Sequence, residues 1–212
     1  MRIIFWIGTI CVLPFAGVLL LAIFIGPGNQ HQDRSYALNN LRMLGVCLYE
    51  FDSEYGRFPD VLTIAAVKAT TSTPLTLDDS SSNKLFRQLL AYGAESEKPF
   101  WAKTPATPRN PDELFVTDAQ ALAPGECAFT YIAGLSSNDA PETPLVMTSL
   151  EKEKTTFDRS AFDGKALILF LDLSARPLPI EKDGRVLING MDIFDPRQPF
   201  WKGKAPDIKW QE

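Results

Sequence analysis

The chain has 212 residues, a net charge of −5 at pH 7 and a hydrophobic fraction of 45%. This hydrophobic fraction is that of an ordinary globular protein. The acidic balance argues against nucleic acid as a partner and against a basic patch for membrane surfaces. The 16 prolines and 13 glycines indicate a loop-rich domain rather than a helical bundle.

The most apolar part of the sequence is the uncharged run Ile3–Ile25. As a helix rising 1.5 Å per residue, this run would reach about 35 Å, enough for the roughly 30 Å hydrocarbon core of a bilayer. A cleaved signal peptide has a shorter apolar region, and Phe24-Ile25-Gly26-Pro27 is a poor cleavage site. We therefore expect residues 1–28 to be an N-terminal anchor, single-pass in the inner (cell) membrane. Residues 29–212 would then form one domain in the periplasm or outside the cell.

An amphipathic helix pattern follows the apolar run. Its apolar residues recur at steps of three or four and form one stripe: Leu38, Leu41, Leu44, Leu48, Phe51 and Tyr55. Gly56 suits the C′ position of a helix, and Pro59 prevents the helix from continuing. The two helix patterns are consistent with one long rod that is bent or interrupted at Gly26-Pro27-Gly28. The stripe would pack against whatever follows.

Shorter elements are predicted in the middle of the chain. Residues 61–68 indicate a short helix or turn, and residues 70–83 a polar loop. A helix is expected from Lys84 to Gly93, capped by Ser82 or Asn83. The four prolines of residues 99–112 predict an extended surface segment.

The last part of the chain changes to a strand-like periodicity. We predict strands over Ala128–Ala133, Pro144–Thr148, Ala166–Leu173 and Arg185–Ile188, and the third of these is apolar enough to be central in a sheet. Helices followed by antiparallel strands define an α+β order. From Asp195 onward, the proline-rich tail is expected to wrap the sheet as an irregular strap.

Several stretches of the sequence carry a resemblance to a known family. Ala37–Arg42 leads into Asp52-Ser53-Glu54-Tyr55-Gly56-Arg57-Phe58-Pro59. Gly125–Tyr131 follows, and then Phe162–Ala166 through Asp172-Leu173-Ser174. This layout resembles the type IV pilin-like proteins, especially the pseudopilins of type II secretion systems. The resemblance implies a long N-terminal helix packed on a small antiparallel sheet. It also implies a non-enzymatic structural or accessory subunit whose partners are secretion or pilus assembly proteins.

The chain departs from this family at its N-terminus. Family members carry a short basic leader followed by Phe-Thr-Leu-Ile-Glu, and neither stands here. The glutamate of that motif is the residue through which family members stack into filaments. The resemblance therefore implies a pilin-like domain that does not polymerise in the usual way.

Few residues suggest chemistry, and we predict no enzyme activity and no catalytic or cofactor-binding residue. His31 is the single histidine, so a histidine-based zinc site or catalytic triad lacks its ligands. Ser81-Ser82-Asn83-Lys84 matches the Ser-x-x-Lys spacing of serine acyl-enzymes, but the companion motifs are missing. A helix cap is the favoured interpretation of this segment.

Calcium is the one metal that the sequence leaves open, although we assign no metal ligand. Asp183, Asp192 and Asp195, with Asn189 among them, offer oxygen atoms of the kind that Ca²⁺ takes. Ordinary turn-forming carboxylates are the favoured alternative. A binding module for calcium or an envelope ligand is accordingly the second functional hypothesis.

The cysteines and two pairs of aromatic residues each allow two interpretations. Cys47 and Cys127 could form a disulfide in an oxidising compartment, but two buried free thiols are favoured. Phe100-Trp101 and Phe200-Trp201 are either an exposed aromatic contact surface or, preferably, anchors that pin their proline-rich segments to the core.

Overall fold

Helices come first along the chain and strands later. The computed structural model describes residues 30–148 and 150–212. Its helices are α2 (Gln30–Tyr55), α3 (Ile64–Thr71) and α4 (Ser82–Tyr92), and a short 3₁₀ turn covers Lys98–Phe100. The predicted amphipathic helix is confirmed by α2, and the predicted helix after Ser82 by α4. The turn or helix expected at residues 61–68 is α3, displaced by three residues.

Five strands form one antiparallel sheet in the order β4-β3-β2-β1-β7. Their bounds are Phe129–Ala133 for β1, Pro144–Thr148 for β2, Lys165–Phe170 for β3, Ala175–Pro179 for β4 and Asp207–Lys209 for β7. A separate hairpin joins β5 (Leu187–Ile188) to β6 (Met191–Asp192), and a second 3₁₀ turn covers Pro199–Trp201. Three predicted strands match β1, β2 and β3, although β3 ends three residues earlier than expected.

The tail differs from the irregular strap that the sequence predicts. It ends in β7, whose Ile208 lies opposite Ile132 of β1 at one edge of the sheet. Only one residue of β7 is apolar, so no alternation signals this strand. The other edge strand, β4, contains Pro177 and Pro179, which lack the N–H needed to extend a sheet and are tolerated at edges.

The structure corrects the first helix of the predicted fold class and the single-pass membrane location that followed from it. α2 begins at Gln30, and nowhere in residues 30–148 and 150–212 does a helix combine the length and the apolar character needed to cross a membrane. One side of α2 is polar, whereas a membrane span is apolar all round. The predicted anchor, residues 1–28, lies outside the described residues. In place of a helix that is transmembrane and then amphipathic, the described part of the chain has three helices and a five-stranded sheet.

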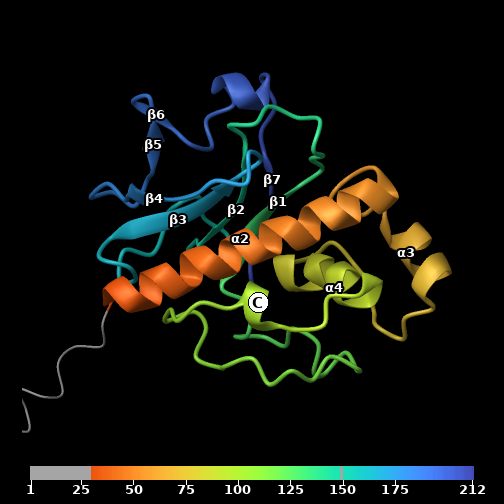
Figure 1. The fold of residues 1–212 in the computed structure, drawn as a ribbon. Coiled ribbons are helices and arrows are strands. Elements are labelled where there is room, and N and C mark those ends of the chain that lie inside the picture. The colour runs from red at the N-terminus through yellow and green to blue at the C-terminus, as the bar shows by residue number, and fades with distance from the viewer. Residues whose placement is uncertain (1–29, 149) are drawn as a thin grey trace, which may run out of the picture.

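α2 lies across one face of the sheet, with α4 beside it (Figure 1). The buried side of α2 consists of Ala37, Leu41, Leu44, Leu48 and Phe51, all fully buried in one cluster with Leu167 and Leu169 of β3. The Tyr49 hydroxyl also donates a hydrogen bond to the Leu171 carbonyl beyond β3. The stripe of the sequence analysis is therefore the surface through which α2 packs on the sheet.

The opposite face of the sheet is covered by the segments between β4 and β7. Ile132, Met147, Ile168 and Phe170 point to this side and form a second buried cluster, which includes Phe194, Phe200 and Trp201. Successive residues of a strand point to opposite faces, so a sheet covered on both faces needs continuous apolar strands. This explains why Ala166–Phe170 is apolar without alternation.

Gly45 sets how closely α2 approaches β3. A Cβ atom at this position would lie 3.1 Å from Leu173 Cδ2 and 3.2 Å from Leu169 Cδ2. We expect Gly45→Val to lower the free energy of unfolding by about 2 kcal/mol, because the branched side chain would overpack this contact. Urea unfolding measures the change. Asn39→Val, at an exposed position of the same helix, is the control and should leave the urea midpoint almost unchanged. Equal midpoints for the two variants would contradict the prediction.

Candidate functional site

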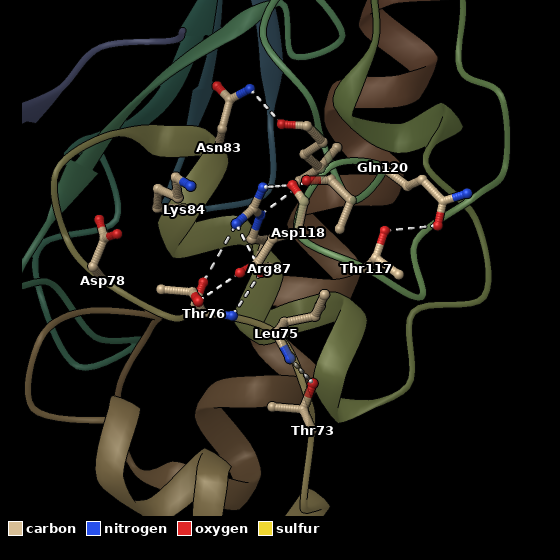
Figure 2. Close-up of polar contacts among 12 residues, drawn as sticks. Thr73, Leu75, Thr76, Asp78, Asn83, Lys84, Arg87, Thr117, Asp118 and Gln120 are labelled. Carbon is tan, nitrogen blue, oxygen red and sulfur yellow. Dashed lines mark hydrogen bonds and ion pairs between the residues drawn. The ribbon is translucent and has the colours of Figure 1, made fainter.

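A buried arginine in α4 joins two loops that are distant in sequence. The Arg87 side chain is 2% exposed. Its Nε donates to the Ala121 carbonyl at 2.8 Å, and its Nη2 donates to the Asp118 carbonyl at 2.6 Å. Its Nη1 lies 3.4 Å from the Thr76 carbonyl oxygen and 3.3 Å from Asp118 Oδ1 (Figure 2). The guanidinium thus directs its donors at protein oxygen atoms on both loops.

Asp118 completes this network from the second loop. One of its carboxylate oxygens accepts the Thr76 N–H at 2.7 Å, and the other accepts the Thr76 hydroxyl at 2.5 Å. These two bonds, with Arg87 as a smaller contribution, hold the pKa of Asp118 below its usual value. Because each charged group is occupied by the other or by the backbone, the network acts as a clamp between the loops. The Arg87 guanidinium and the Asp118 carboxylate are already bound to protein groups, so neither is placed to react with a substrate.

The start of α4 explains how Arg87 is placed. Ser81, rather than Ser82 or Asn83, is the N-cap, and its side chain accepts a hydrogen bond from the Lys84 N–H. Asn83, one turn before Arg87, donates its side-chain amide to the Leu122 carbonyl at 2.9 Å. The side of α4 that carries Asn83 and Arg87 therefore faces residues 118–123. No local pattern in the sequence marks Arg87 as a functional residue, because its partners Asp118 and Ala121 lie 31 and 34 residues away.

Two buried carboxylates hold the segment that follows. Glu97 is 1% exposed and Glu126 is 2% exposed. Glu97 Oε1 accepts the Leu122 N–H and Glu126 Oε2 accepts the Ala123 N–H, both at 2.8 Å. Arg109 Nη2 lies 3.1 Å from Glu126 Oε1. Within the described residues, Glu97 Oε2 has no hydrogen-bond partner.

This environment shifts the titration of both carboxyl groups. Burial raises the pKa of Glu97 to about 7; the hydrogen bond from Leu122 opposes the rise, and the nearby carboxylates of Glu126, Asp112 and Glu113 add to it. Burial also raises the pKa of Glu126. Perturbed carboxyl groups are common at functional sites. Here each one receives a backbone N–H of residues 122–123, which is the geometry of a loop anchor.

The residues considered for catalysis lie apart from these clusters. His31 is exposed in the first turn of α2. Ser81 caps α4, as the favoured interpretation of Ser81–Lys84 requires, and its hydroxyl also donates to Glu212 Oε1 at 2.6 Å. The Glu212 N–H in turn donates to Asn83 Oδ1 at 3.1 Å. These side chains secure the last residues of the chain to the start of α4.

The three aspartates considered for calcium act in separate turns. Arg185 Nε lies 2.7 Å from Asp183 Oδ2, and Arg197 Nη2 lies 2.6 Å from Asp195 Oδ2. Asp192 Oδ1 accepts the Phe194 N–H at 2.8 Å. Across the described ranges, no three His, Cys, Asp or Glu side chains come together as a metal-binding group. The turn-forming interpretation matches the geometry of all three residues.

The two cysteines of the domain are free thiols. Burial raises the pKa of Cys127 to about 12, and burial followed by the nearby Glu50 carboxylate raises the pKa of Cys47. A thiol with a raised pKa is a poor nucleophile, because the thiolate is the reactive form. The favoured interpretation, two buried free thiols rather than a disulfide, agrees with this geometry, although Cys47 is only partly buried.

The aromatic pairs pin their proline-rich segments to the core, which was the preferred of the two interpretations. Phe100 is fully buried, and Trp101 Nε1 donates to the Arg109 carbonyl at 2.8 Å. Phe200 and Trp201 are 7% and 5% exposed, and Trp201 Nε1 donates to the Ile193 carbonyl at 2.7 Å. Neither pair forms an open aromatic surface.

Comparison with known proteins found no relative of this chain. No protein-family model, no curated protein and no solved structure matches the chain.

Proposed function

We propose that this chain is a non-enzymatic structural or accessory protein of pilin-like type, working with a type II secretion or type IV pilus-like assembly. The observation that supports the proposal is the position of α2, a 26-residue helix whose apolar side lies along an antiparallel sheet (Figure 1). A helix packed on a small antiparallel sheet is one part of what the pilin resemblance implies, whereas no helix of the described residues has the transmembrane part that it also implies. The polar clusters support a structural role too, because Arg87, Glu97 and Glu126 all bind backbone groups of loops.

Exposed apolar side chains on loops are consistent with an interaction protein. Leu62, before α3, is 67% exposed, and Val116, in the segment before Asp118, is 70% exposed. Val61 and Leu114 beside them are 55% and 48% exposed. Apolar side chains at these positions lose contact with water when a partner covers them, which stabilises a complex.

Site-specific photocrosslinking in the producing cells tests the proposal. A photoreactive amino acid is placed at Leu62 or at Val116, and the same amino acid at exposed Lys182 is the control. We expect the two apolar positions, but not Lys182, to capture components of a secretion or pilus assembly, identified by mass spectrometry. Deleting the gene should also impair secretion or pilus formation. Unchanged secretion together with no captured assembly component would overturn the proposal.

A further inference from the structure

The side of α2 that faces away from the sheet carries exposed apolar residues. Tyr36, Met43 and Val46 are 45%, 45% and 50% exposed. They lie on one side of the helix, together with the exposed polar residues Asn39, Arg42 and Glu50. We call these six residues the outer stripe. Exposed apolar residues along one side of a helix that already buries its other side indicate a second contact surface.

The charges of the outer stripe are separated along the helix. Arg42 lies before its centre, and Glu50 lies after it. Glu50 forms no salt bridge within the described part of the chain, and the Arg42 guanidinium makes only a hydrogen bond of 3.4 Å, to the Ala175 carbonyl. A surface whose two halves have opposite charge is complementary to itself when the second copy is reversed.

We propose that the outer stripe is a self-association surface, on which α2 of a second copy of this chain packs antiparallel. A two-fold axis passing between Met43 and Val46 sets Met43 against Val46 of the second copy. The same register sets Asn39 opposite Glu50 of the second copy, with Arg42 only three residues, or about 4.5 Å along the axis, from that carboxylate. A two-fold axis forms each of these contacts twice. The inference rests on α2 alone and does not require the proposed function.

Charge selects both the orientation and the occupant. In a parallel pair, Arg42 would face Arg42 and Glu50 would face Glu50, and such like-charge contacts are unfavourable. The apolar run Ile3–Ile25 of the same chain has no charged residue, so it offers nothing to Arg42 or Glu50. A second copy in the antiparallel orientation joins Met43 to Val46 and sets Glu50 nearer to the Arg42 than to the Glu50 of the other copy.

Charge reversal in the full-length chain tests the contact between Arg42 and Glu50. We expect sedimentation velocity over a concentration series to show a dimer whose Kd rises about tenfold or more in Arg42→Glu and in Glu50→Arg. The double variant Arg42→Glu/Glu50→Arg restores the opposite charges and should recover the original Kd. Lys68→Glu, at an exposed position of α3, is the control and should not change it. A monomer at all concentrations, or a double variant as weak as the single ones, would overturn the proposal.

Disulfide trapping distinguishes this dimer from association through other parts of the chain. In a Cys11→Ser/Cys47→Ala background, a Met43→Cys chain is mixed with a Val46→Cys chain and oxidised. The antiparallel register predicts that the mixed disulfide forms in preference to either symmetric one. Preferential symmetric disulfides would indicate a parallel pair. Protection of both cysteines from maleimide in a monomer would indicate that residues 1–29 cover the stripe. Either result would overturn the proposal.

Discussion

Replacing Arg87 with methionine is expected to lower the free energy of unfolding by about 3 kcal/mol. Methionine retains an apolar stem in α4 but donates no hydrogen bond. The carbonyls of Thr76, Asp118 and Ala121 would lose the donor that they share, and the Asp118 carboxylate would lose its cationic neighbour. Leaving polar groups without partners costs more than a typical hydrogen bond contributes, because their hydration is not regained inside the protein. Equilibrium unfolding in urea measures the difference.

Lys84→Met is the matched control for this prediction. It removes the same charge from the same helix, but Lys84 is only partly buried and its side chain has no hydrogen bond or salt bridge to the described residues. We expect a change of less than about 1 kcal/mol, as is usual for surface positions. Hydrogen exchange adds a local measurement, since Arg87→Met should increase exchange at Thr76, whose N–H is bound by Asp118. Equal losses of stability in the two variants would show that the clamp contributes nothing specific.

Local patterns predicted most of the regular elements. The stripe from Leu38 to Tyr55 repeats at helical spacing because α2 buries one side against the sheet. The apolar run at Ala166–Leu173 indicated an interior strand because both faces of the sheet are covered. In each case, the residues that define the element also make its main contacts, so a short window of sequence contains the information.

The parts that sequence reasoning missed depend on distant contacts. β7 forms because Ile208 pairs with Ile132, 76 residues earlier in the chain, and its own sequence has no strand periodicity. Arg87 is indistinguishable from a solvent-facing arginine until the loop at Asp118–Ala121 is placed over it. In the sequence, Glu97 likewise resembles any surface glutamate, and only its hydrogen bond from the Leu122 N–H distinguishes it. Buried polar residues serve partners far away in sequence, and for this reason they leave no local signal.

Glu97→Gln is expected to make the stability of the protein less dependent on pH. The pKa of Glu97 is about 7 in the folded state, because burial disfavours the charged carboxylate, and near 4.5 in the unfolded chain. The folded state therefore binds this proton more tightly, and the resulting stabilisation is fully present below pH 4.5. It is lost as the pH rises through 7. The shift corresponds to about 3 kcal/mol at 1.36 kcal/mol per pH unit.

A neutral glutamine has no carboxylate to ionise in the buried site, while its Oε1 can still accept the Leu122 N–H. The variant should match the wild type near pH 4 and exceed its free energy of unfolding by about 3 kcal/mol near pH 8. Urea unfolding at intervals between these pH values gives the free energy of unfolding of each protein as a function of pH. The contributions of the other titrating groups cancel when one curve is subtracted from the other. Glu95→Gln, at an exposed position two residues earlier, is the control and should give a difference that is flat with pH. If the Glu97→Gln difference were flat as well, the Glu97 carboxyl group would titrate with an ordinary pKa, and its burial would not be coupled to folding.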